Sequence, residues 1–210
     1  MESYGKLMFT PAVQAEQRAR GSREMCERIA ERAAPGALGP DESAFIASRT
    51  SVYIASVSEN GWPYVQHRGG PHGFLKVLNE NTVGFADYRG NAQYITSGNL
   101  RSDARVSLFA MDYPRKARLK LQGHASMIPA DADPALAEKL ATEGGGRVER
   151  IVLIRVKAFD WNCPQYITPR FDTSEIAALV APELERLETR NAELEAELAR
   201  LRADKEREET

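Results

Sequence analysis

The 210-residue chain has few of the features that mark several large classes of protein. It contains only two cysteines, Cys26 and Cys163, and no CxxC pair, so a disulfide framework is not expected. No apolar run approaches the roughly 20 residues that span a bilayer. The N-terminus also lacks the basic start and apolar stretch of a signal peptide. We therefore predict a cytoplasmic protein with no membrane contact.

An excess of positive charge is absent as well. The formal net charge is −2 and the pI is about 6.0, whereas general nucleic-acid binders are usually basic. No GxGxxG follows a predicted strand and no Walker A loop is present, which argues against a dinucleotide-binding or P-loop domain. His67 and His72 have no cysteine or carboxylate cluster beside them, so no metal site is predicted.

The pattern of the chain divides it into three predicted parts: a helical segment over 1–40, a β-rich domain over 41–172 and a C-terminal helix over 173–210. In the first part, Thr10 is placed to cap a helix and Pro11 to occupy its first position.

The middle of the chain reads as short strands joined by hairpins. The Asn60-Gly61 pair between two alternating segments is a strong hairpin signal. The predicted strands cover residues 51–58, 62–68, 74–79, 82–87, 104–112, 117–127 and 150–159. Two short helices are expected near 91–99 and 133–141. This arrangement predicts an α+β, mainly β fold built on a small antiparallel barrel.

The loop between the second and third of these strands is unusually rich in glycine. In "HRGGPHGF", Arg68 is followed by Gly69, Gly70 and, after two residues, Gly73. A tight turn needs one or two glycines. The additional glycine indicates a close approach of another group to the backbone.

The C-terminal segment carries a heptad repeat. Leucines 187, 194 and 201 fall at d, leucines 184 and 198 at a, and Asn191 is the one polar a residue. In a parallel pair of helices, Arg190 would face Glu195 and Glu197 would face Arg202, whereas Glu183 would face Glu188 and repel it. The pattern predicts a parallel two-stranded coiled coil. An amphipathic helix lying on its own domain is the alternative.

Four segments together resemble the pyridoxamine 5′-phosphate oxidase-related family of FMN-binding split barrels. They are "SVYIASVSENGWPYVQHRGGPHGFLKVL", "TVGFADYRGNAQYITSGNL", "VSLFAMDYPRKARLKLQGHA" and "AFDWNCPQYITPR". The resemblance implies an FMN-binding split β-barrel with N-terminal helices and a C-terminal coiled-coil helix. It also implies a homodimer with FMN at the subunit interface, each site being built from both chains.

The resemblance also implies which residues bind FMN. They are His67, Arg68, Gly69, Gly70, Tyr88, Arg89, Asn91, Lys116 and Arg118. A phosphate dianion needs arginine or lysine side chains and backbone N–H donors, and the helix expected after Arg89 and Asn91 would add its N-terminus. The glycines would let peptide N–H groups reach the flavin ring. Lys116 and Arg118 would reach across from the partner chain, or else are solvent-exposed charges of a hairpin.

One part of the family pattern is missing. The tail "WNCPQYITPRF" lacks the arginine–histidine pair with which the vitamin-converting oxidases hold the pyridoxal ring, so oxidation of pyridoxamine phosphate is not expected. The resemblance then implies an FMN-dependent oxidoreductase that accepts hydride from NADH or NADPH and passes electrons to oxygen, flavin or a small acceptor. No catalytic side chain is assigned, because the cofactor carries the chemistry. The alternatives are a flavin-binding sensor or partner module, and a haem-binding split barrel.

Overall fold

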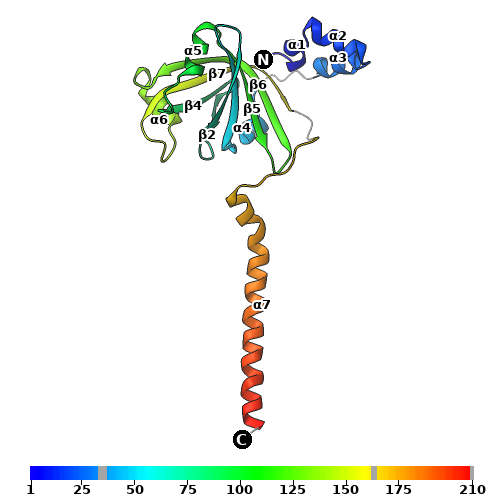
Figure 1. Ribbon diagram of the computed structural model, residues 1–210, viewed down its shortest axis with the longest axis vertical. Helices are drawn as coiled ribbons and strands as arrows, with labels where there is room; N and C mark the ends of the chain where they lie inside the picture. Colours follow the sequence, from blue (N-terminus) through cyan, green and yellow to red (C-terminus); the bar gives the residue numbers. More distant parts are fainter. Residues whose placement is uncertain (33–36, 162–164, 209–210) are drawn as a thin grey trace. The chain divides into compact units, whose positions relative to one another are not determined.

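A computed structural model describes residues 1–32, 37–161 and 165–208. The chain forms two compact units, Met1–Ile167 and Thr168–Thr210. The first unit contains the β-sheet and helices α1 to α6, and the second contains helix α7 (Thr173–Glu208) (Figure 1).

Seven antiparallel strands form one sheet in the first unit. They are β1 (Ser51–Val57), β2 (Pro63–Gly69), β3 (Lys76–Asn79), β4 (Thr82–Tyr88), β5 (Arg105–Asp112), β6 (Ala117–Pro129) and β7 (Val148–Trp161). Each lies within two residues of its predicted segment. The order across the sheet is β2-β1-β5-β6-β7-β4-β3, so β2 and β3 are the two outermost strands.

The sheet curls on itself until β2 meets β4. Four strands lie between these two in the sheet order, yet Nη1 of Arg68 on β2 lies 2.7 Å from Oδ1 of Asp87 on β4. A flat sheet would hold them several strand spacings apart. The fold is therefore a split β-barrel of the α+β, mainly β class, as predicted. We call the place where β2 meets β4 the seam of the barrel, and the Arg68–Asp87 ion pair crosses it.

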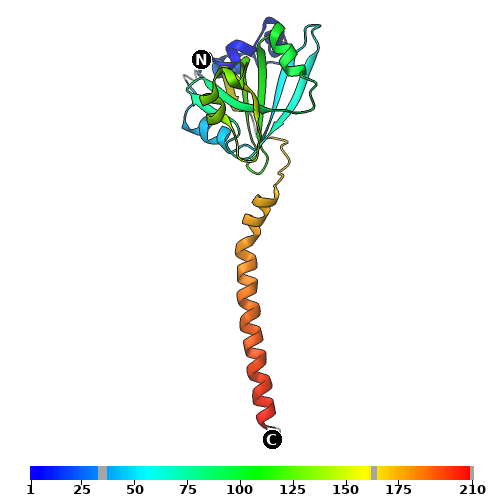
Figure 2. The same cartoon turned by 90° about the vertical axis from the view of Figure 1, so that its left-hand side faces the viewer.

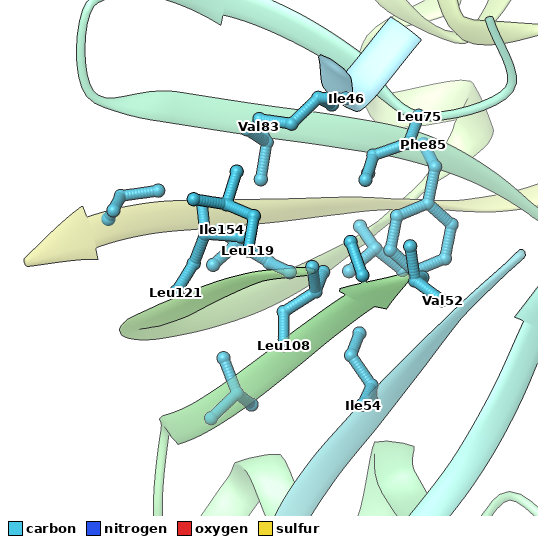
Figure 3. Close-up of a cluster of buried hydrophobic side chains, with 14 of the residues drawn as sticks. Ile46, Val52, Ile54, Leu75, Val83, Phe85, Leu108, Leu119, Leu121 and Ile154 are labelled. Carbon is cyan, nitrogen blue, oxygen red and sulfur yellow. The ribbon is translucent and has the colours of Figure 1, made fainter. Parts of the chain in front are cut away.

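The interior of the barrel holds the apolar core. Alternate residues of each strand point inward, because successive side chains of a strand lie on opposite faces. Val52 and Ile54 on β1, for example, are almost fully buried. Figure 3 shows this cluster, which also includes Ile46, Leu75, Val83, Phe85, Leu108, Leu119, Leu121 and Ile154. Ile46 comes from helix α4 (Pro40–Ala47), so that helix contributes to the core as well.

Three short helices precede α4: α1 (Tyr4–Met8), α2 (Pro11–Ala19) and α3 (Arg23–Arg32). The hydroxyl of Thr10 accepts a hydrogen bond from the Val13 N–H at 3.4 Å, as the predicted N-cap requires. Helix α1 was not predicted, because five residues are too few for a periodic pattern. It depends on tertiary contact: Ser3 Oγ donates to the Ala30 carbonyl at 2.6 Å, and a Cβ on Gly5 would lie 2.5 Å from the Ala30 Cβ.

The helix predicted near 91–99 begins later than expected. Helix α5 covers Ile95–Ser102. Asn91 Oδ1 accepts from the Gln93 N–H at 3.2 Å, and Ala92 and Tyr94 have left-handed φ values of 59° and 53°. A turn therefore occupies these residues, so Arg89 and Asn91 are separated from the helix N-terminus. The second helix predicted here is α6 (Pro134–Leu140), preceded by the 3-10 turn η1 (Ala130–Ala132).

Helix α5 packs against strand β1, and Figure 2 shows this green helix beside the cyan strands. Asn99 Nδ2 donates to Ser56 Oγ at 2.9 Å, and both side chains are buried. Thr96 Oγ1 donates to Gln66 Oε1 on β2 at 2.7 Å. These bonds fix α5 against β2, an edge strand of the sheet, and against β1 beside it.

Candidate functional site at the barrel seam

Two cavities adjoin the seam. One has a volume of about 180 Å³ and is lined mainly by polar residues of β2 and of the loop that leads into α5. The other has a volume of about 210 Å³ and includes Phe74 and Phe85 in its lining. Arg68, Asp87 and Tyr88 line both, so the two cavities meet at the ion pair that crosses the seam.

Successive side chains of β2 point to opposite faces of the sheet, and this alternation decides which of them reach the seam cavities. Arg68 pairs across the ladder with buried Val52, whereas His67 pairs with exposed Tyr53. Arg68 therefore points inward. His67 lines part of the second cavity, but its imidazole lies 5.7 Å, centroid to centroid, from the Tyr53 ring on the outer face.

A buried carboxylate joins two arginines at the centre of the site. The Asp87 side chain is 1% exposed and accepts from Arg68 Nη1 at 2.7 Å, and from Arg150 Nη2 and Nε at 2.6 and 2.9 Å. The arginine side chains keep 23% and 20% of their surface exposed. Two guanidinium groups thus share one carboxylate, and Arg150 Nη1 also lies 3.9 Å from the second carboxylate, that of Glu149.

Arg68 also retains an unused donor. Its Nε is buried and has no hydrogen-bond partner among the described residues. A buried donor without a partner is costly unless a ligand or water satisfies it. The cluster is therefore suited to an anionic or acceptor-rich ligand.

Arg150 was missed by the sequence reading, which treated it only as the start of a strand. It lies directly opposite Asp87 in the β4–β7 ladder, and its guanidinium lies 4.7 Å from the centre of the Tyr94 ring. One signal was available: an aspartate that ends an apolar strand needs a cationic partner when it is buried. The sequence could not show which strand would supply it.

The loop after β4 forms the polar wall of the first cavity. The lining of this cavity includes Asn91 and Tyr94 from the loop and Thr96 from α5. Arg89 is exposed and is absent from the described lining of both cavities. Asn91 therefore lies where a ligand phosphate or hydroxyl could reach it, whereas Arg89 lies outside the described lining of both cavities.

The glycine-rich loop has a different explanation from the one predicted for Gly70. The Gly70 N–H donates to the Thr50 carbonyl at 2.9 Å, so it is not free for a flavin. A Cβ on Gly70 would lie 2.6 Å from the Cβ of Phe74. Packing against Phe74 thus requires this glycine. Gly69 and Gly70 do line the second cavity, and Gly73 has the left-handed φ of 79° that glycine adopts readily.

Tyr88 holds the loop that follows α6. Its hydroxyl accepts from the Thr142 N–H at 2.7 Å and lies 3.0 Å from Thr142 Oγ1. Its ring packs against Gly145, where an added Cβ would lie 2.4 Å away. Tyr88 therefore forms a wall between the cavities through contacts that its own chain fixes.

Lys116 and Arg118 lie on and beside the β5–β6 hairpin turn. Lys116 is exposed with a left-handed φ of 54°, and Arg118 is half-buried on β6. The described lining of the two cavities includes neither residue. The Nε of Arg118 is buried without a hydrogen-bond partner in the described part of the chain.

Two negative findings apply to residues 1–32, 37–161 and 165–208. No group of three or more histidine, cysteine, aspartate or glutamate side chains could hold a metal ion there. No helix in these ranges is long and apolar enough to cross a membrane. Cys163 and the centre of the "WNCPQ" segment lie outside the described residues.

Fold and site together define a split-barrel protein with two small cavities that meet beside arginine side chains at its seam. The sequence profile of the pyridoxamine 5′-phosphate oxidase family matches residues 38–161, more than half of the chain. The chain belongs to this family. No curated protein matches it significantly.

Solved structures with a similar fold are distant in sequence. HupZ from Group A Streptococcus is 15% identical, with a TM-score of 0.49 over 63% of this chain and 99% of HupZ. A protein from Clostridium acetobutylicum related to general stress protein 26, of the pyridoxinephosphate oxidase family, is 16% identical, with a TM-score of 0.44 over 65% and 94%. An F420 reductase is also 16% identical, with a TM-score of 0.41 over 56% and 94%.

Proposed function

We propose that this protein is an FMN-dependent oxidoreductase that accepts hydride from NADH or NADPH and passes electrons to oxygen, free flavin or a small acceptor. The observation that carries the proposal is the Arg68–Asp87–Arg150 cluster where the two seam cavities meet, inside the region matched by the family profile. A flavin-binding sensor would use the same cluster, and it differs from the proposed enzyme in whether NADH or NADPH reduces the bound flavin.

The residues at the seam fit FMN. A phosphate dianion is best held by guanidinium groups and polar side chains, and Arg68, Arg150, Asn91 and Thr96 line the first cavity. The second cavity adds the aromatic side chains of Phe74 and Phe85, which suit a flat ring. When bound, FMN would supply the ring that takes up the hydride.

The chain's own residues have two tasks in this proposal. Arg68 and Arg150 bind and orient the cofactor, and their positive charges favour an anionic reduced flavin. Asp87 holds both guanidinium groups in place, since each donates to one of its oxygens. No side chain in the seam is assigned as an acid or base.

A second copy of the chain would complete the site. Small-molecule pockets usually enclose about 300–1,000 Å³, whereas each cavity of the single chain holds only about 180 or 210 Å³. In a homodimer, Lys116 and Arg118 would come from the partner, and a ligand acceptor would satisfy the buried Nε of Arg118.

Pyridoxamine phosphate is not the proposed substrate, because the tail residues that would hold its ring are missing from the sequence.

Purified protein tests this function directly. We expect it to bind one FMN per chain without a covalent bond, and NADH or NADPH should bleach the flavin absorbance under nitrogen. Admission of air or a small acceptor should restore the absorbance. Stoichiometric FMN that neither nucleotide reduces would favour the sensor alternative. A protein that binds haem and no flavin would exclude the proposal.

The phosphate group of FMN leads to a second prediction, on the difference in affinity between FMN and riboflavin. FMN should bind at least about tenfold more tightly than riboflavin, because hydrogen bonds to charged groups contribute about 1.5–3 kcal/mol each and riboflavin has no phosphate to accept them. Flavin fluorescence titrations measure both affinities. Equal affinities would remove Arg68 and Arg150 from any contact with a phosphate.

A further inference from the structure

Helix α7 carries an apolar stripe that nothing within its own unit covers. The helix has 36 residues and is therefore about 54 Å long at 1.5 Å per residue. The leucines of its heptad are 53% (Leu184), 44% (Leu187), 41% (Leu194), 52% (Leu198) and 58% (Leu201) exposed. Helices in water are stabilised mainly by packing an apolar face, so this stripe needs a partner surface.

We infer that the partner is helix α7 of a second copy of this chain, in a parallel two-stranded coiled coil. The charges beside the stripe complement each other in that arrangement. Arg190 of one copy faces Glu195 of the other, and Glu197 faces Arg202. In the single chain Arg190 instead pairs with Glu193 along the exposed helix surface, at 2.9 Å, an interaction of small value that the interhelical pair can replace.

Asn191 determines the direction of the pairing. It is exposed and is the one polar residue among the a and d positions from Leu184 to Leu201. In a parallel alignment the two Asn191 amides face each other and can form a hydrogen bond between the two helices. In an antiparallel alignment, a residues face d residues, so each amide would lie against a leucine. The parallel form is therefore favoured, and with it two strands rather than three or four.

The helix is well formed from its start. Asp172 Oδ1 accepts from the Glu175 N–H at 2.8 Å, and Glu175 Oε2 accepts from the Asp172 N–H at 2.9 Å, which is a capping box. Pro182 lies inside the helix, at the f position, which points away from the heptad stripe. The coil needs no flavin, so this inference is independent of the proposed function.

Disulfide trapping tests the coil and its direction. Asn191→Cys would be made in the full chain with Cys26 and Cys163 replaced by serine. Opposed a residues come close enough for a disulfide, which requires Cα atoms roughly 4.4–6.8 Å apart. We expect oxidised glutathione to convert most of the protein to a covalent dimer on a non-reducing gel. Thr189→Cys, at the outward f position, is the matched control and should react at least tenfold more slowly.

Three further variants make the result specific. Leu198→Cys, one heptad further on, should crosslink as fast as Asn191→Cys, because a parallel coil opposes every a residue with its own copy. Arg190→Glu should slow the trapping at residue 191, and the addition of Glu195→Arg should restore it. Equal rates at residues 189 and 191 would overturn the coil. Fast trapping at residue 191 with slow trapping at residue 198 would overturn its parallel direction.

Discussion

Replacing Arg68 with alanine should weaken FMN binding by about 1.5–3 kcal/mol, the range for hydrogen bonds to charged groups, which is roughly 10- to 150-fold in Kd. Arg68 lines both seam cavities, and its Nε is buried without a partner in the described chain. The variant should still fold, because Asp87 keeps its bonds to Arg150 at 2.6 and 2.9 Å.

The affinity of apo protein for FMN, measured by quenching of flavin fluorescence, checks this result. Arg105→Ala is the matched control: this arginine is exposed on β5 and pairs with Asp103 away from the seam cavities. Arg68→Lys should give an intermediate affinity, because it keeps the charge and loses the forked geometry. Wild-type affinity in Arg68→Ala would show that the flavin lies elsewhere.

Replacing Asp87 with alanine should destabilise the first unit by about 3 kcal/mol, near the lower end of the range for removing one partner of a buried ion pair. The substitution leaves two guanidinium groups close together, with only the Glu149 carboxylate, 3.9 Å from Arg150 Nη1, as a counter-charge. The effect falls at the lower end because Arg68 and Arg150 each keep about a fifth of their side-chain surface exposed to water. The melting temperature should fall by roughly 6–12 °C.

Thermal unfolding followed by circular dichroism measures this loss. Glu59→Ala, in the exposed turn between β1 and β2, is a matched carboxylate control and should change stability by less than about 0.5 kcal/mol. Adding Arg150→Met to Asp87→Ala should recover part of the stability, because one of the two facing charges is gone. If the double variant is less stable than Asp87→Ala alone, repulsion between the arginines is not the cause.

Much of the fold could be read from local patterns in the sequence. Alternating apolar residues and turn signals placed all seven strands, because the two-residue period of a strand is a local property. Thr10 and Pro11 marked the start of α2 for the same reason: capping involves neighbouring residues. Arg68 could be singled out because a cation before several glycines is unusual in a hairpin loop.

Two other features could not be predicted, one because it depends on a distant contact and the other because it depends on a single short side-chain bond. Helix α1 exists through its packing on Ala30 of α3. The turn at Asn91 to Tyr94 moved the start of α5 to Ile95, which separated Arg89 from the helix N-terminus. In both places local propensity is weak, so long-range packing or a short side-chain bond decides the backbone conformation.

The sequence by itself determined the strands, the heptad of α7 and the presence of a cation beside a glycine-rich loop. Only the tertiary structure decided which side chains of the strands and of the glycine-rich loop come into contact. Closure of the barrel brings Arg68 of β2 to Asp87 of β4 across four intervening strands, and ladder pairing sets Arg150 on the other side of Asp87. The tertiary structure also places the Gly70 N–H on the Thr50 carbonyl, at 2.9 Å. The physical reason is that a strand pattern specifies which face a side chain takes, whereas the curvature of the whole sheet determines which side chain it meets.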